Sequence, residues 1–108
     1  MSNDNSVALF ERARNSLAGG VSHQSRFAEP NPKYINKASG AHKWEVDGTR
    51  FVDYAMGSAS LLLGHSHPDV ARAIAEQASE GSFYADCHPL EVQWAEMVCN
   101  AVPGAERL

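Results

Sequence analysis

Arg26 is the first residue whose surroundings suggest chemistry, and it ends the segment SHQSR at 22–26. A guanidinium among small and polar side chains suits two parallel hydrogen bonds to a carboxylate. The stretch from Val21 to Pro32 has few strand formers and two prolines, so we predict an extended loop there. A solvated surface arginine is the alternative. The sequence therefore offers Arg26 as a candidate carboxylate-binding residue.

Imidazole groups could bind a metal or cap helices, and the chain has five: His23, His42, His65, His67 and His88. His65 and His67 could supply two ligands, but no third His, Asp or Glu follows at the spacing of a known metal site. His67 and His88 each precede a proline, which the first turn of a helix tolerates. We predict no metal site, helix caps at His67 and His88, and a tight turn at His65.

The nucleophilic side chains lack neighbours that would activate them. No serine lies in a Gly-x-Ser-x-Gly motif, and the adjacency of Cys87 and His88 in sequence does not place a thiolate beside a base. Cys87 and Cys99 are far from any CxxC arrangement, so reduced structural thiols are expected. Gly19-Gly20 lacks the rest of a phosphate-binding loop.

A loop of small residues, Met56 to Leu63, includes Gly57, Ser58, Ala59 and Ser60. Backbone can approach a ligand closely where so little side chain intervenes. We therefore expect chemistry in this loop rather than in the strands that precede it.

Those strands are predicted to form a hairpin about Asp47-Gly48, a pair typical of a two-residue type I′ turn. Such a turn places Trp44, Val46 and Phe51 on one face of the hairpin. With a first strand at Tyr34–Ala38, the result is a three-stranded antiparallel sheet. The predicted cross-strand pairs are Val46 with Thr49, Glu45 with Arg50, Trp44 with Phe51 and Lys43 with Val52.

Three helices are predicted around this sheet. The first covers Asn5–Ala18, with Asn5 or Ser6 as its cap and Gly19-Gly20 at its end. The second runs from the Pro68 region to about Ser79, and the third from the Pro89 region to about Ala101. Each of the last two has an apolar stripe predicted to face a core. The stripes are Val70, Ala71, Ile74, Ala75 and Ala78, and then Leu90, Trp94, Met97, Val98 and Ala101.

The overall composition is that of an ordinary globular domain, and its net charge is −4. An acidic chain with scattered basic residues offers no electrostatic footprint for nucleic acid or an anionic membrane. No apolar run reaches the length of a membrane-spanning helix, and the start MSNDNS resembles no signal peptide. We expect a cytoplasmic protein.

Four segments, taken in order, resemble the N-terminal part of class III pyridoxal-phosphate aminotransferases, and most of all the glutamate-1-semialdehyde aminomutase branch. They are LFERARNSLAGGVSHQSRF, GAHKWEVDGTRFVDYAMG, LLLGHSHPDVARAIAEQ and HPLEVQWAEMVCNAVPGAERL. The resemblance implies an α/β protein of fold type I, usually a homodimer. This chain would supply an α+β portion of it, with one helix, a three-stranded antiparallel sheet and two further helices.

The resemblance also implies site residues. In the aminomutase branch the arginine after Gly-Gly-Val binds the substrate carboxylate, a role that maps onto Arg26. That branch usually has Asn-Ser-Pro-Val where this chain has SHQS, and a tryptophan near the substrate where this chain has Ser58. Ser58 is thus a second candidate substrate-binding residue. These differences reshape the substrate pocket and make another amino acid, such as a β-amino acid, a competing substrate.

The cofactor, pyridoxal 5′-phosphate, needs a lysine, a carboxylate and a phosphate loop. Lys33, Lys37 and Lys43 fall in or beside the predicted sheet, so we expect no cofactor lysine and no catalytic residue in this chain. We expect a fragment, inactive alone, with residues 1–66 forming the helix, loop and sheet and residues 67–108 leading into a large cofactor domain. A non-catalytic protein-interaction module derived from the family is the alternative.

Overall fold

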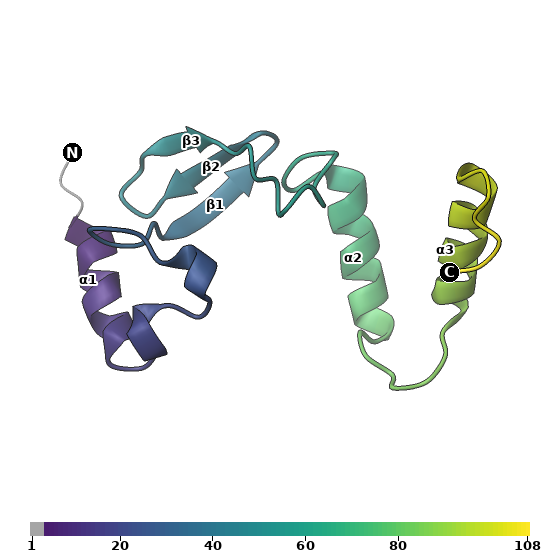
Figure 1. The fold of residues 1–108 in the computed structure, drawn as a ribbon, viewed down its shortest axis with the longest axis horizontal. Coiled ribbons are helices and arrows are strands. Elements are labelled where there is room, and N and C mark those ends of the chain that lie inside the picture. Colours follow the sequence, from purple (N-terminus) through teal and green to yellow (C-terminus); the bar gives the residue numbers. More distant parts are fainter. Residues whose placement is uncertain (1–3) are drawn as a thin grey trace. The chain divides into compact units, whose positions relative to one another are not determined.

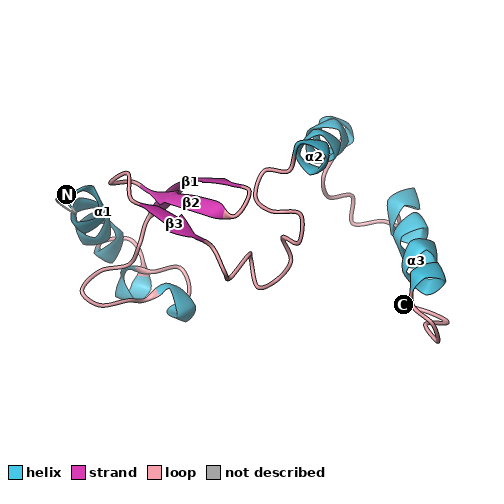
Figure 2. Cartoon of the chain, turned by 90° about the horizontal axis from the view of Figure 1, so that it is seen from above, coloured by secondary structure: helices cyan, strands magenta, loops and turns pink. Residues whose placement is uncertain are grey.

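The computed structural model describes residues 4–108 and contains three α-helices and one three-stranded antiparallel sheet (Figures 1 and 2). The predicted α+β composition is confirmed. In chain order the elements are α1 (Asp4–Arg14), β1 (Ile35–Ser39), β2 (His42–Glu45), β3 (Arg50–Val52), α2 (Pro68–Glu80) and α3 (Pro89–Ala101). None of the helices in the described part of the chain is both long and apolar enough to cross a bilayer.

The chain divides into two units, one ending at Ala71 and the other covering residues 72–108. The division falls inside α2. The first unit contains α1 and the sheet, in which β2 lies between β1 and β3 (Figure 1). The second contains most of α2, the connection from Gly81 and α3.

The register of the hairpin differs by one residue from the prediction. Trp44 pairs with Arg50 rather than Phe51, and Phe51 pairs with Lys43. The cause is a three-residue loop, Val46 to Gly48, closed by a bond from the Glu45 N–H to the Thr49 carbonyl at 2.9 Å. Gly48 takes the left-handed conformation that such a loop requires at its third position, with φ of 86°.

This shift exchanges the faces of the hairpin. Because neighbouring residues point to opposite faces, Trp44 lies with Arg50 while Phe51 lies with Lys43. The predicted surface pair between Glu45 and Arg50 is therefore wrong. Glu45 is buried and accepts a 3.4 Å hydrogen bond from the Ser6 hydroxyl of α1.

The start of α1 is capped from a distance rather than by its own residues. The Asp47 carboxylate, in the hairpin loop, accepts hydrogen bonds from the backbone N–H groups of Asn5 and Ser6, each at 3.1 Å. Free N–H groups in the first turn of a helix favour such an acceptor. The predicted cap at Asn5 or Ser6 is wrong because both residues lie inside the helix.

The end of α1 also comes earlier than predicted, at Arg14 rather than Ala18. Its last turn tightens into bonds over three residues, such as Asn15 N–H to the Arg12 carbonyl, and Leu17 is extended. The chain then returns so closely that a Cβ on Gly20 would lie 2.5 Å from the Phe10 ring. Only glycine fits this return.

The bounds of α2 and α3 agree closely with the prediction, and so does one of the two caps. His88 forms a capping box with Glu91: its Nδ1 accepts from the Leu90 N–H at 3.2 Å, and Glu91 accepts from the His88 N–H at 3.1 Å. His67 precedes α2, but its buried Nδ1 has no hydrogen-bond partner. The predicted side-chain cap at His67 is therefore wrong.

The predicted burial of the two apolar stripes is also wrong within this chain. No residue of α2 or α3 is buried, and Ile74, Trp94 and Met97 are 63%, 61% and 71% exposed. Among residues 5–108, no hydrophobic side chain is fully enclosed. Helical periodicity predicts which residues share a face, but it does not say whether the covering surface lies in the same chain.

Candidate functional site

Arg26 ends a short 3-10 turn, Gln24–Arg26, inside the predicted loop. The His23 side chain caps this turn by accepting from the Ser25 N–H at 3.2 Å. The Arg26 guanidinium is exposed and donates to the Ser22 hydroxyl at 2.6 Å. One neutral contact leaves the remaining guanidinium N–H groups available to an anionic ligand.

A cavity of about 450 Å³ lies beside Arg26 in the first unit. Its lining combines two cations, Arg26 and Lys33, with apolar side chains that include Val21 and Ile35. Tyr34 also lines it, and the buried Tyr34 hydroxyl has no hydrogen-bond partner. Such a cavity suits a small molecule with an anionic group and a less polar body.

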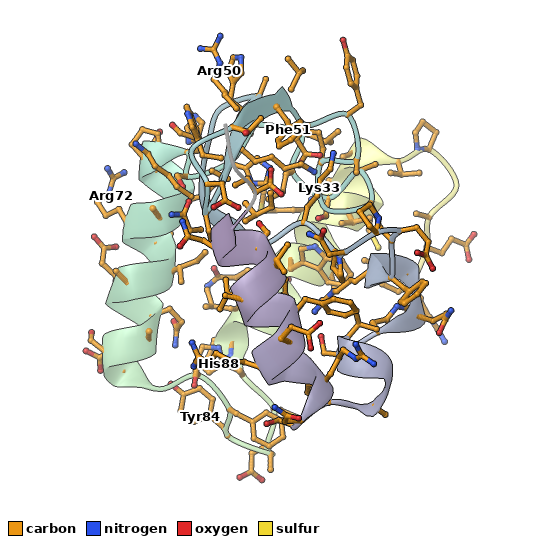
Figure 3. The ribbon with its side chains drawn as sticks, turned by 90° about the vertical axis from the view of Figure 1, so that its left-hand side faces the viewer. Lys33, Arg50, Phe51, Arg72, Tyr84 and His88 are labelled. Carbon is orange, nitrogen blue, oxygen red and sulfur yellow. The ribbon has the colours of Figure 1, made fainter. Side chains whose placement is uncertain are left out.

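Lys33 belongs to this lining but also contacts the sheet. Its Nζ lies 4.1 Å from the centroid of the Phe51 ring, and Figure 3 shows the two side chains together. A cation over an aromatic face is held by the electrostatic field of the ring. This contact fixes one positive charge near the cavity, at a position set by the register of the hairpin.

Ser58 lies elsewhere in the first unit, on the loop that follows β3. It is exposed and does not line the cavity beside Arg26, so the structure does not bring the two predicted substrate-binding residues together. Residues 56–59 all have left-handed backbone, with φ of 43°, 60°, 60° and 67°. Only Gly57 adopts this freely, and each of the other three costs roughly 1–2 kcal/mol.

The base of this loop carries a charged cluster that the sequence did not predict. Asp53 as a residue is 7% exposed, and its carboxylate accepts from Lys43 Nζ at 2.9 Å, from His65 Nε2 at 2.7 Å and from the Ala55 N–H at 3.1 Å. The hydrogen bonds from His65 and then Lys43 hold the pKa of Asp53 well below its usual range. Asp53 is thus a fixed negative charge that joins three segments.

The sequence signal that could have indicated this cluster is the position of Asp53, directly after a strand and before a loop of small residues. Its partners lie 10 and 12 residues away in sequence, and no fixed spacing links them. Residues 4–108 contain no group of three or more side chains, around His65 or elsewhere, that could hold a metal ion. The predicted turn at His65 is instead a bridge to Gly40, with two backbone hydrogen bonds of 2.9 Å.

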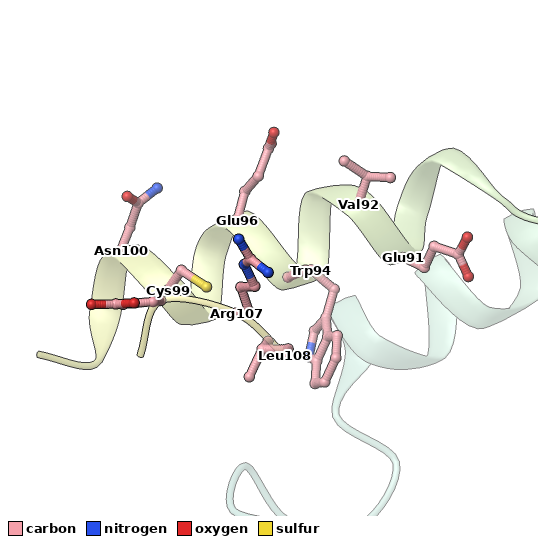
Figure 4. Close-up of a pocket in the computed structure, with 10 residues that line it drawn as sticks. Glu91, Val92, Trp94, Glu96, Cys99, Asn100, Arg107 and Leu108 are labelled. Carbon is pink, nitrogen blue, oxygen red and sulfur yellow. The ribbon is translucent and has the colours of Figure 1, made fainter. Parts of the chain in front are cut away.

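The second unit has a larger cavity, about 710 Å³, on one side of α3. Figure 4 shows Arg107 and Leu108, from the segment after α3, lying beside Trp94. Cys99 also lines this cavity, and both cysteines of the chain are free. Next to α3, Tyr84 stacks on His88 with ring centroids 5.0 Å apart (Figure 3). His88 is therefore engaged both as a cap and as a stacking partner.

A lysine that holds a carbonyl cofactor must present a free amine to it. Lys43 is paired with Asp53, Lys33 lies over Phe51, and Lys37 Nζ lies 5.1 Å from the centroid of the Trp44 ring. These three are the only lysines of the sequence. Each of the three amines is therefore engaged with a carboxylate or lies over an aromatic ring.

Comparison with known proteins places these features in a family. Residues 24–108 match the family described as aminotransferase class-III. A glutamate-1-semialdehyde 2,1-aminomutase from Haloarcula marismortui is 41% identical over the whole chain, which spans 24% of that protein. The chain thus spans about a quarter of the length of the curated relatives it matches.

Solved structures of transaminases have the same fold. An omega-transaminase from Sphaerobacter thermophilus matches 94% of the chain with a TM-score of 0.88 and 30% identity, over 23% of its own length. A beta-phenylalanine aminotransferase from Variovorax paradoxus matches 97% with a TM-score of 0.87 and 28% identity, over 24% of its length. The family match, the aminomutase relative and the shared fold agree, and the chain belongs to the class III aminotransferase family.

Proposed function

We propose that this chain is the N-terminal portion of a pyridoxal-phosphate-dependent enzyme that moves an amino group, as glutamate-1-semialdehyde 2,1-aminomutase does. The 41% identity to an enzyme of that name, over the whole chain, is the observation that carries the proposal. Residues outside this chain would hold the cofactor. The amines of Lys33, Lys37 and Lys43, which lie over aromatic rings or pair with Asp53, support this assignment.

In this proposal Arg26 binds the carboxylate of the substrate. The guanidinium is exposed beside a cavity of about 450 Å³, and its one hydrogen bond is to a neutral hydroxyl. Lys33 adds a second positive charge to the same lining. A carboxylate bound there would orient the rest of the substrate, which is the contribution of positioning groups to catalysis.

Ser58 is proposed to contact the substrate from the loop that follows β3. Its small side chain, on a backbone with left-handed geometry, leaves the main chain open to a ligand. A serine in place of the tryptophan of the aminomutase branch enlarges the space available there. This difference, with the likeness to a beta-phenylalanine aminotransferase, favours a second candidate function, transamination of a β-amino acid.

The two candidates are separated by assaying the intact protein, loaded with pyridoxal phosphate. The first predicts isomerisation of glutamate-1-semialdehyde without a second substrate, and the second predicts amino transfer from a β-amino acid to a 2-oxo acid. Activity with neither substrate class would refute the proposal. The proposal also includes a homodimer and a cytoplasmic location, which light scattering and cell fractionation test.

The role of Arg26 is tested by Arg26→Ala in the same protein. We expect kcat/KM to fall by an amount equivalent to roughly 2–5 kcal/mol, the usual cost of removing one partner from a desolvated charge pair. Arg26→Lys should recover only part of this, because lysine keeps the charge without the planar fork. Arg50→Ala, at an exposed position on β3 that Figure 3 shows, is the matched control. Equal kinetics for Arg26→Ala and Arg50→Ala would remove Arg26 from the site.

A further inference from the structure

The loop 54–64 begins and ends at the same place, the turn between β1 and β2. At its start, the Asp53 N–H donates to the Ala41 carbonyl at 2.8 Å. At its end, His65 and Gly40 exchange two backbone hydrogen bonds of 2.9 Å. Neighbouring residues of one turn therefore hold both ends of the loop.

The Asp53 side chain joins those two ends directly. Its Oδ2 accepts from His65 Nε2 at 2.7 Å, while its Oδ1 accepts from Lys43 Nζ at 2.9 Å and from the Ala55 N–H at 3.1 Å. Both carboxylate oxygens are used, and the side chain is 6% exposed. An aspartate with both oxygens bonded from three directions has little freedom to turn.

The backbone at the end of the loop is also packed closely against the turn between β1 and β2. Gly64 lies against Gly40 with φ of 85°, and a Cβ there would come within 3.1 Å of the Gly40 backbone. One residue beyond His65, the Ser66 hydroxyl donates to the Ala38 carbonyl of β1 at 3.1 Å. The end of the loop is thus fixed to the sheet by backbone and side-chain contacts.

Inside the loop, by contrast, the hydrogen bonds described below join residues close in sequence. The left-handed turn is held by Ala59 N–H to the Ala55 carbonyl and Leu61 N–H to the Met56 carbonyl, both at 3.0 Å. The Ser60 hydroxyl donates to the Gly57 carbonyl at 2.7 Å. Left-handed backbone is unfavourable for residues other than glycine, so this loop conformation persists only if contacts around it hold it in place.

We propose that Asp53 and His65 are positioning residues that hold the loop 54–64 closed and so fix where Ser58 meets the substrate. The second half of this statement rests on the proposed function. His65 acts here as a hydrogen-bond donor, which is a different role from metal binding or helix capping. Lys43 supports the same carboxylate from β2.

Hydrogen exchange on the intact protein tests the closure without an activity assay. In His65→Phe the aromatic ring is kept and the donor is lost, so the hydrogen-bonded amides of the loop, such as those of Ala55, Ala59 and Leu61, should exchange at least tenfold faster while those of β1 and β2 keep their rates. In His65→Gln the amide donor replaces Nε2–H, and exchange should return to within about twofold of the parent. Unchanged exchange in both His65→Phe and Asp53→Asn would overturn the proposal.

A double-mutant cycle tests the link to Ser58. Ser58→Ala should raise the substrate KM in the parent protein but have little further effect in His65→Phe, because the loop is already displaced. Strictly additive effects would overturn the link. If Ser58→Ala alone leaves KM and kcat unchanged in an active enzyme, the substrate role of Ser58 fails, and the exchange result still decides the closure.

Discussion

Two aspartates of the first unit are single residues on which several segments depend. Asp47 accepts from the first turn of α1, and hydrogen bonds from Ser6 and then Asn5 hold its pKa below the ordinary 3.8. Asp53 joins the two ends of the loop 54–64, with its pKa lowered by His65 and Lys43. Both carboxylates are bound in their charged form.

These lowered pKa values predict the direction of acid sensitivity. A carboxylate whose pKa is lower in the folded state contributes stability above its unfolded pKa, near 3.8, and loses that contribution as pH falls toward the folded pKa. We therefore expect α1 and the loop 54–64 to loosen below about pH 4. Hydrogen exchange of the intact protein at stepped pH measures this.

Asp47→Asn and Asp53→Asn are the matched variants for this test. Each should exchange faster at neutral pH, and each should lose the acid-dependent change in its own segment alone. A parent protein whose α1 and loop amides keep the same protection from pH 6 to pH 3, after correction for intrinsic rates, would contradict the assignment.

Residue roles were predictable from sequence only where the partners are near in the chain. The cap at His88 was correctly predicted from the proline that follows it, and its partner Glu91 lies only three residues away, whereas the same pattern at His67 gave a wrong prediction. The role of Asp53 could not be predicted, because its contacts with Lys43 and His65 exist only after the hairpin forms and the loop returns to the sheet. The roles of Arg26 and Ser58 in binding substrate stay predictions.

Among the elements, the hairpin shows that a pair of turn residues can predict a turn between two strands without predicting which residues pair across it. Asp47-Gly48 correctly predicted a turn between two strands, yet the loop has three residues and not two. In the observed loop Gly48 alone needs positive φ, while Asp47 is free to bind the start of α1. A contact 41 residues distant was outside what the pair of residues could indicate.

Two glycines with positive φ allow a matched test of close packing. Gly20→Ala places a methyl group 2.5 Å from Phe10, whereas Gly48→Ala meets nothing within 4 Å. Gly48→Ala should cost about 1–2 kcal/mol from its backbone conformation alone. Gly20→Ala should cost more, because the return of the chain against α1 must shift.

The measurement is the local opening free energy of the intact protein from hydrogen exchange, taken over α1 for Gly20→Ala and over β2 and β3 for Gly48→Ala. Equal losses for the two variants would show that the approach of Gly20 to Phe10 contributes nothing to the stability of α1.

For the whole chain, the main feature is apolar surface with no cover among the described residues. Trp94, Met97 and Ile74 are more than half exposed, and residues 5–108 enclose no hydrophobic side chain completely. Periodicity located α2 and α3 to within a residue or two, but it does not show what covers their apolar faces. This is why the elements could be predicted and their packing could not.

We expect the isolated 108-residue chain to melt without a sharp transition and to bind a hydrophobic dye. We also expect no pyridoxal-phosphate absorbance change, because each lysine amine is engaged with Asp53 or lies over an aromatic ring. Circular dichroism, dye fluorescence and absorbance titration check these outcomes. A cooperative melt with low dye binding would instead support the alternative of an independent interaction module.

The hydrogen bond between Asp53 and His65 bears on how much the loop between them can vary. Because the two ends of residues 54–64 are already joined, the number and type of residues between them can vary at little entropic cost to the sheet below. We therefore expect residues 54–64 to tolerate changes of length and sequence while the sheet keeps its structure. If Ser58 meets the substrate as proposed, exchanging this segment for the matching stretch of a related transaminase should alter the choice of substrate.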